Sequence, residues 1–579
     1  MQIGVLTTPP GNDPTTARYA PYVAEILAHA GIPWVPVNTD NLQDTLSETA
    51  VLVLPAHRIL DPDGQAAIKR FVESGRVLIA CGGTSGLEGL LGCRDQGAIS
   101  EAWFRPTSDS RHVVTRDIDP DQPLHAFGGR LIRADGDVSV LAEWLDAGDF
   151  RSDSGSWSAG SLGPACTVRQ VGRGYALLIA ADLVYSVVRV QQGRAIHFDG
   201  QPASDGTAPV NDGILKTDDG IVLDYERDRV PCAGTRFFGR GVADQWRELL
   251  IRAVLWGLHA TDTAIPMLWY WPDLIKAVGL LSHDTDGNDP ALAQVLLDNL
   301  LKLEVPSTWC VQYPGGYAPA FYRQLHRQGY EIALHFDAFT QKGRTHWCAE
   351  DLSLQLDWLR DMAKTPVICN KNHYLRWEGL DEFFVWLERV GILSDESKGP
   401  SKTGNTGFPF GGCHPWFPVH EHTMRMIDVL EVNLATQDLA LTCPPEIGPA
   451  VVDWALSHYG IAHFLFHPAH AAKPDVAEAM RSVVAYAKSQ GIPWWTNAKI
   501  QDWERRRRKV TMRPDTSSGT PAWSVVAEQT MPDATFLWFG DRAPQVAGIK
   551  KSREIEVYGF KATAFVVDLE AGQRLILNA

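Results

Sequence analysis

The sequence lacks the cysteine pattern of a disulfide scaffold or a zinc ribbon. Its 579 residues include nine cysteines, with no Cys-x-x-Cys pair and no regular spacing. Either structure needs paired cysteines, so we expect reduced thiols. The opening residues MQIGVLTTPP contain no basic segment followed by an apolar one, and no run of about 18 apolar residues occurs. We therefore expect a cytoplasmic protein without a membrane span.

Positive charge is also scarce. The chain has 53 Lys and Arg against 69 Asp and Glu, a net charge of −16. Nucleic acids and anionic membranes are bound by concentrated basic surfaces, so this balance argues against both as partners. Apolar residues make up 45% and charged residues 21% of the chain, as in ordinary globular proteins. The length predicts several domains that fold throughout.

The first ninety residues alternate between strand-like and helix-like segments. Strands are predicted at IGVLTT, PWVPVN, AVLVLPA and RVLIACGG, and helices at ARYAPYVAEILAHAG and DGQAAIKRFVESG. This alternation predicts an α/β domain built on an open parallel sheet of the flavodoxin type. Residues 185–245 are rich in Gly and Asp and predict loops and hairpins on that domain. The linker TDTAIP ends the domain, which we place at residues 1–262.

This first domain resembles the class I glutamine amidotransferase-like fold. In that family a reactive cysteine follows the strand that corresponds to RVLIA, so Cys81 occupies the position of the nucleophile. The family's His-x-Glu motif is absent from the matching strand GRGYALLIAADL, and His197 and Asp199 are poorly placed substitutes. A thiol without a base is a weak nucleophile, so we expect a catalytically inactive domain. The resemblance implies a packing role, or homo-oligomerisation through this domain.

Strands and helices alternate again from Pro266 to about Arg508. Seven or so repeats of this kind predict a closed or nearly closed parallel (β/α) barrel, assigned to residues 263–508. In such barrels the functional residues lie at the carboxyl ends of the strands. The last seventy residues contain short alternating strands, AWSVVAE, ATFLWFG, EIEVYGF and ATAFVVDL. They predict a small β-sandwich at residues 509–579.

Four predicted barrel strands end on Asp or His. KAVGLLSHDTDGN ends on Asp284 and Asp286, YEIALHFD on His335 and Asp337, VICNKNHY on His373, and AHFLFHPAH on His467 and His470. Each residue alone is a weak signal. Together they form an Asp and His cluster typical of a site for Zn²⁺ or another borderline divalent metal.

On these motifs the central region resembles the polysaccharide deacetylase family, which has the NodB homology fold. Asp-Thr-Asp-Gly at 284–287 resembles the family's Asp-Asp-Gly turn in its HDxD-type subgroup, Glu331 to His335 its Glu-Ile-x-x-His strand, and Phe466-His467 its late Leu-His. The resemblance implies that Asp284 is the general base, that Asp286 and His335 bind the metal, and that His467 assists the leaving group. It implies Zn²⁺, with Co²⁺ or Ni²⁺ as alternatives.

The third metal ligand departs from the family pattern. The family has a second His four residues after the first, and this chain has Phe339 there. His373 is the preferred substitute because it ends a strand of the same barrel. His346, in a polar loop, is a second candidate, and a site with two ligands or no metal is a third reading.

Four further residues are predicted to contact substrate. Trp377 and Trp416 lie in loop segments near His373 and His414, and flat indole rings can stack on sugars. Arg376 follows His373 and could bind a hydroxyl or a carboxylate. His414 lies in the Gly- and Pro-rich segment GFPFGGCHPWFP, which is typical of a loop at a barrel mouth.

The sequence thus predicts a metal-dependent hydrolase that removes N-acetyl groups from an amino-sugar-containing saccharide. A water activated by the metal and by Asp284 would attack the amide carbonyl, and His467 would protonate the departing amine. Two other readings stay open. One is a related amide hydrolase of a small nitrogenous substrate, and the other is a non-catalytic carbohydrate-binding protein.

Overall fold

The computed structural model describes residues 1–7, 15–39, 42–107, 112–152, 154–200, 213–339, 347–401, 403–515 and 522–578. Contacts divide the chain into two compact units. Unit 1 comprises Met1–Arg189, Gln245–Leu274 and Glu504–Ala579, and unit 2 comprises Val190–Asp244 and Ile275–Trp503. Both units mix helices and strands, as the sequence predicts. The division into three domains at residues 262 and 508 stays a prediction.

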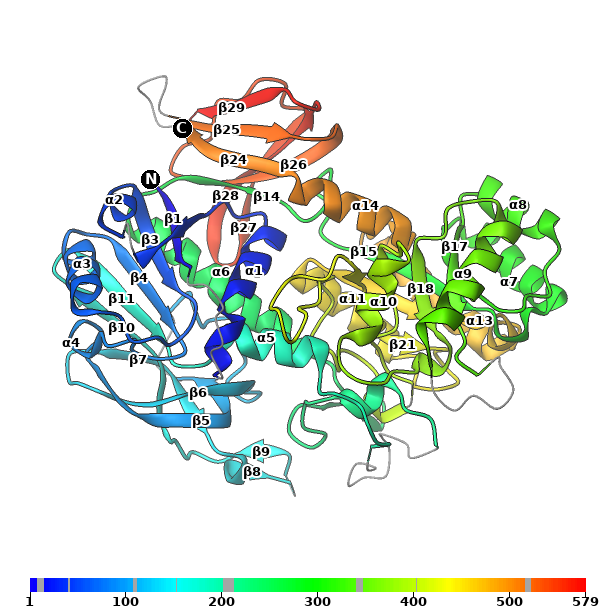
Figure 1. Ribbon diagram of the computed structural model, residues 1–579, viewed down its shortest axis with the longest axis horizontal. Coiled ribbons are helices and arrows are strands. Elements are labelled where there is room, and N and C mark those ends of the chain that lie inside the picture. Colours follow the sequence, from blue (N-terminus) through cyan, green and yellow to red (C-terminus); the bar gives the residue numbers. More distant parts are fainter. Residues whose placement is uncertain are drawn as a thin grey trace. The chain divides into compact units, whose positions relative to one another are not determined.

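Unit 1 is built on a nine-stranded mixed sheet, coloured blue to cyan in Figure 1. The strand order is β2-β1-β3-β4-β11-β10-β7-β5-β6. The first five strands in this order are parallel, and β1 to β4 among them lie in the first ninety residues, where the sequence predicts a parallel sheet. The other four strands are antiparallel and come from later in the chain, so the first ninety residues do not predict them. The strands are β1 (Gln2–Leu6), β2 (Val35–Val37), β3 (Thr49–Leu54), β4 (Val77–Cys81), β5 (Cys93–Pro106), β6 (Leu124–Ala134), β7 (Ser139–Leu145), β10 (Gly163–Val171) and β11 (Gly174–Ile179).

In unit 1, helix α3 begins with residues that favour a helix N-terminus. In α3 the side chain of Asp61 accepts a hydrogen bond from the Gly64 N–H, and Pro62 occupies the first turn, where no N–H partner is lost. Its buried face packs against the sheet. The helices are α1 (Val23–His29), α2 (Leu42–Ser47), α3 (Pro62–Glu73), α4 (Glu88–Leu91), α5 (Leu183–Gln192) and α6 (Val242–Ala260), the last two of which extend across a unit boundary.

The C-terminal strands form two antiparallel sheets. One has the order β14-β26-β28-β27 and the other β24-β25-β29. The predicted strands are present, and β14, from the beginning of the region predicted to form the barrel, joins them through the register Ile265 to Phe539. The strands are β14 (Ile265–Leu268), β24 (Val510–Asp515), β25 (Ala522–Ala527), β26 (Met531–Phe539), β27 (Lys551–Val557), β28 (Phe560–Leu569) and β29 (Arg574–Asn578).

Unit 2 is built on a parallel sheet with the order β20-β19-β18-β17-β16-β15-β22-β21, with β23 paired to β15. No pairing between the end strands β20 and β21 occurs in the described part of the chain, so the sheet is a half-barrel. The strands are β15 (Val278–Asp284), β16 (Thr308–Gln312), β17 (Glu331–Phe336), β18 (Cys369–Asn372), β19 (Ser394–Asp395), β20 (Leu430–Glu431), β21 (Thr436–Gln437), β22 (Ile461–Leu465) and β23 (Trp494–Trp495).

Helices follow most strands of the half-barrel and are drawn green to orange in Figure 1. Most of them contribute buried residues to a large apolar core that includes Trp309, Phe383 and Phe464. The helices are α7 (Pro290–Leu303), α8 (Pro319–Arg327), α9 (Ala349–Ala363), α10 (Glu382–Arg389), α11 (Ile447–His458), α12 (Pro468–Ala471), α13 (Pro474–Ser489) and α14 (Asn497–Arg508), the last of which continues into unit 1. Among the described residues, no helix is both long and apolar enough to cross a membrane.

The loop-rich segment after α5 belongs to unit 2. The sequence assigns residues 185–245 to the first domain, but the backbone N–H of Ile196 donates to the Gly379 carbonyl at 2.9 Å, and that of Trp377 donates to the Leu215 carbonyl at 3.1 Å. These backbone hydrogen bonds connect residues that are distant in the sequence, and local composition carries no sign of them.

Cys81 is buried at the end of β4. Its side chain is 1% exposed, and burial together with the nearby Asp182 raises the pKa of the thiol to about 12. A neutral, inaccessible thiol is a poor nucleophile. His197, considered as a base from the sequence, is exposed and belongs to unit 2.

We expect Cys81→Ala to leave hydrolytic activity within a few-fold of wild type, because this thiol is protonated and inaccessible. The measurement compares substrate hydrolysis and glutamine-dependent ammonia release in the two proteins. Ammonia release that the substitution abolishes would contradict the prediction.

Candidate functional site

The Asp and His residues singled out in the sequence meet at the carboxyl ends of the parallel strands in unit 2. Asp284 is the last residue of β15, and His335 is the last but one of β17. His373 follows β18 directly, and His467 lies two residues beyond β22. Because parallel strands end at the same edge of a sheet, their side chains converge there.

Three of these residues form a group with metal-binding geometry. One ligand atom from each of Asp286, His335 and His373 lies within 4.8 Å of the other two. Asp286 Oδ1 is 3.2 Å from His335 Nε2 and 3.8 Å from His373 Nε2. Gly287 after Asp286 has a φ of +69°, a left-handed conformation that glycine adopts without strain. This turn directs the carboxylate back toward the two imidazoles.

The imidazole of His335 is held in the orientation a metal ligand needs. Its Nδ1 lies 2.9 Å from the Lys371 carbonyl oxygen, which can only accept, so Nδ1 carries the hydrogen. Nε2 is buried, and despite its proximity to Asp286 it has no partner with hydrogen-bond geometry. A backbone carbonyl in this position is a common second partner of metal-binding histidines. The donor set of one carboxylate and two imidazoles therefore fits a divalent ion such as Zn²⁺.

The charges of this group also favour a cation. Burial alone would raise the pKa of Asp286, but its interaction with His335 and the charges of His467 and His373 hold that pKa well below its usual range. Burial lowers the pKa of His335, and the carboxylates of Asp284 and Asp286 more than reverse this, so the pKa is raised. The two carboxylates thus draw positive charge to the centre of the group.

Asp284 lies at the inner side of the group. It is 4% exposed, and its Oδ2 is 3.8 Å from His335 Nε2. Its Oδ1 is 3.6 Å from Nζ of Lys371, a fully buried residue of β18 that also lies 3.1 Å from Glu396 Oε2. Burial lowers the pKa of Lys371, but Asp284 and Glu396 outweigh it and raise the pKa. Lys371 is therefore a permanent cation behind Asp284.

His467 is held by a buried carboxylate that follows β21. Its Nδ1 lies 2.6 Å from Asp438 Oδ2, and its Nε2 is 3.8 Å from Asp286 Oδ2. Asp438 also accepts from Nδ1 of His470 at 2.7 Å. Burial by itself would lower the pKa of His467. The opposing effect of Asp438 is larger, and the pKa is raised to about 9. His467 is therefore protonated at neutral pH, and its Nε2–H faces the metal-binding group.

His283 lies beside Asp284 in β15, where successive side chains point to opposite faces of the sheet. It is fully buried, its Nδ1 is 2.8 Å from the Phe466 carbonyl oxygen, and its ring packs against Trp309 with centroids 5.3 Å apart. Burial lowers its pKa to about 4. His283 is a neutral residue of the interior.

The structure does not leave the predicted tryptophans available to a substrate. Trp377 is 0% exposed, and Lys398 Nζ lies 3.9 Å from the centre of its ring. Trp416 is 1% exposed, and its Nε1–H donates to Asn433 Oδ1 at 3.0 Å. Arg376 is also buried and is paired with Glu378. Both indole rings and the Arg376 side chain are thus part of the interior, and their contact with a substrate stays a prediction.

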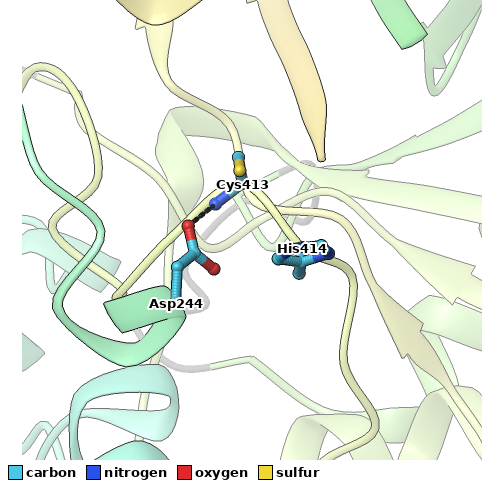
Figure 2. A group of neighbouring side chains, drawn as sticks. All are labelled: Asp244, Cys413 and His414. Atoms are coloured by element: carbon cyan, nitrogen blue, oxygen red, sulfur yellow. Dashed lines mark hydrogen bonds between the residues drawn. The ribbon is translucent and has the colours of Figure 1, made fainter. Parts of the chain in front are cut away.

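His414 belongs to a different buried group, shown in Figure 2 with Asp244 and Cys413. The ligand-type atoms of the three residues lie within 4.8 Å of one another. However, Asp244 Oδ2 accepts from the backbone N–H of Cys413 at 2.8 Å and from Trp454 Nε1–H at 3.1 Å. This carboxylate fixes the glycine-rich segment before His414.

Two aromatic residues that the sequence analysis did not propose for stacking lie beside the metal-binding group. Tyr374 is 49% exposed and stacks on His373, with ring centroids 4.0 Å apart. Phe339 is 37% exposed, 6.3 Å from Tyr374 between ring centroids, and Arg376 lies over its ring at 4.2 Å. Phe339 thus places an apolar surface beside the metal-binding group. His346 lies outside the described residues.

Sequence reasoning also missed the residues that orient the group. Asp438 and Lys371 have no motif around them, whereas Asp337, 3.4 Å from His373 Nδ1, is at a strand end that the sequence analysis did single out. Gln312, at the end of β16, donates to Asp337 Oδ2 at 3.0 Å and accepts from the Gly287 N–H at 2.9 Å. Their position at the carboxyl ends of parallel strands is the one signal that could have identified them.

We expect His373→Ala and His335→Ala to lower the metal content of the purified protein sharply, because each removes one of three ligands. His326→Ala, an exposed histidine of α8, serves as the matched control and should retain the metal. Metal content is measured by mass spectrometry after loading with Zn²⁺. Loss of metal in His346→Ala and retention in His373→Ala would assign the ligand to the loop histidine instead.

No protein-family model matches the chain, and no curated protein is similar to it. Several solved structures share part of its fold. A protein assigned as a polysaccharide deacetylase from Mycobacterium smegmatis is 17% identical, with 41% of this chain and 93% of that chain covered and a TM-score of 0.32. Puue allantoinase is 14% identical, with 40% of this chain and 92% of that chain covered and a TM-score of 0.32.

A β-galactosidase from Rahnella sp. R3 is 16% identical over 32% of this chain and 30% of that chain, with a TM-score of 0.24. The deacetylase and allantoinase similarities each extend over about two fifths of the chain. The identities and TM-scores are too low to assign a family or an activity.

Proposed function

We propose that the protein is a metal-dependent hydrolase that removes N-acetyl groups from an amino-sugar-containing saccharide. The observation that carries the proposal is the grouping of Asp286, His335 and His373 between Asp284 and His467. Two imidazoles and one carboxylate would hold a divalent ion, with Zn²⁺ preferred and Co²⁺ or Ni²⁺ as alternatives. A bound ion of this kind would polarise the amide carbonyl and lower the pKa of a water molecule.

The two remaining charged residues supply opposite halves of acid–base catalysis. Asp284 is the base that removes a proton from the attacking water, and Lys371 Nζ lies 3.6 Å behind its Oδ1. His467 is the acid. Its Nε2–H would protonate the departing amine, which leaves poorly as an anion, and Asp438 holds the imidazole in this protonation state.

Tyr374 and Phe339 support a saccharide as the substrate. Both rings are partly exposed beside His373, so they can cover the apolar face of a sugar ring whose N-acetyl group reaches the metal-binding group. They take the role that the sequence analysis gave to Trp377 and Trp416.

The proposal is tested with a panel of N-acetylated saccharides, assayed for acetate release by the full-length protein loaded with Zn²⁺, Co²⁺ or Ni²⁺. Acetate release that chelation abolishes is the expected result. If only small linear or cyclic amides are hydrolysed, the protein is a metal-dependent amide hydrolase and a saccharide is excluded as its substrate. Metal binding without turnover of any compound would contradict the proposal.

The two aspartates of the Asp-Thr-Asp-Gly turn are expected to separate experimentally. Asp284→Asn should retain the metal and lose about 10²–10⁴-fold in kcat, because a base is needed for turnover alone. Asp286→Asn should lose both metal and activity. An Asp284→Asn protein that is stripped of metal, or that keeps its full rate, would leave the base unassigned.

Asp438→Asn is expected to lower kcat while the metal content stays unchanged. Removal of the carboxylate lowers the pKa of His467 from about 9, so the acid loses its proton at lower pH and the alkaline limb of the kcat profile moves down in pH. Asp453→Asn, an exposed residue of α11, is the matched control. An unshifted alkaline limb would show that Asp438 does not act through His467.

A further inference from the structure

Unit 1 contains a pocket of about 770 Å³. It lies between the C-terminal half of α6 and the strands β26, β27 and β28, and all of its lining residues belong to this unit. The volume is within the range of about 300–1,000 Å³ that is usual for small-molecule sites. The lining includes no group of His, Cys and carboxylates of the kind described in unit 2, among the residues that the structure describes.

Aromatic side chains form much of the pocket wall. Trp256 and Phe560 are partly exposed, whereas Phe539 and Trp538 are 8% and 1% exposed. Trp256 is held by Tyr175, whose ring meets it edge-on with the centroids 5.5 Å apart. A fixed aromatic wall offers apolar contact without the entropic cost of ordering mobile side chains on binding.

The polar groups around this wall include both donors and acceptors. Asp541, Arg542 and Lys561 line the pocket and are exposed, and none of their side chains has a hydrogen bond or ion pair to another described residue. The indole N–H of Trp538 likewise has no partner within the described ranges. A ligand that both donates and accepts hydrogen bonds would match this set.

Gly540 keeps the indole N–H of Trp538 uncovered. A Cβ at this position would lie 2.7 Å from Trp538 Nε1 and 2.8 Å from Ala264 Cβ, both closer than van der Waals contact allows. Any other residue would therefore push against the pocket wall and cover the donor.

We propose that this pocket is a second, non-catalytic saccharide-binding site. A pyranose ring has an apolar face that fits an aromatic wall and a rim of hydroxyls that donate and accept. The charged lining consists of Asp262, Asp541 and Glu554 against Arg542 and Lys561, so it lacks the excess of positive charge that a polyanion requires. The inference rests on the proposed function for its choice of amino-sugar-containing saccharides as ligands.

The site is tested by binding in the full-length Asp286→Asn protein, in which turnover is not expected. The probes are chitohexaose, cellohexaose and insoluble chitin, with tryptophan fluorescence and co-sedimentation as readouts. At least one probe should bind, and adding Phe560→Ala or Arg542→Ala should weaken that binding about ten-fold. Phe198→Ala and Arg553→Ala are the matched controls, since both residues are exposed outside the pocket.

Two outcomes overturn the inference: no probe binds, or the pocket variants bind as well as the controls. Arg542→Ala changes an exposed side chain without a described partner, so it keeps the test valid if Phe560→Ala fails to fold. Acetate release from the panel of N-acetylated saccharides is measured separately with Asp286 intact. Its absence in the parent protein contradicts the proposed function, whereas its presence together with unchanged probe binding contradicts the second site alone.

Discussion

The arrangement of the site depends on the buried ammonium group of Lys371. This residue is fully buried in the half-barrel, where an unpaired charge would be costly. Asp284 and Glu396 compensate it, and Ser282 accepts one of its hydrogens. Loss of one partner from such a buried set typically destabilises a fold by about 3–5 kcal/mol. The same charges that stabilise unit 2 therefore determine the electrostatics of its candidate site.

Lys371 also connects the two halves of that site. Its carbonyl oxygen accepts the Nδ1–H of His335, and its side chain lies against Asp284. His335 and Lys371 are register partners in β17 and β18, so the sheet itself fixes this arrangement. Backbone pairing positions one ligand of the metal-binding group, and the side chain of the neighbouring strand positions the base. Neither depends on a loop.

The sequence predicts the residues that share a strand end and misses those that depend on distant contacts. Asp284, Asp286, His335 and His373 are found from the sequence because parallel strands bring their carboxyl ends to one edge. Asp438 is missed because it reaches His467 across 29 positions without a motif. The burial of Trp377 is not foreseen because it depends on core packing, which local sequence does not encode.

The discontinuity of unit 1 has a consequence for how the chain folds as it is made. His29 bonds to Glu504 at 2.7 Å, and the two residues are 475 positions apart. β14 likewise finds its partner β26 only after the whole of unit 2 has been synthesised. Contacts of such sequence separation form slowly, and domains generally fold as units during synthesis. The half-barrel can therefore be complete on the ribosome while β14 still lacks its partner β26 and unit 1 is unfinished.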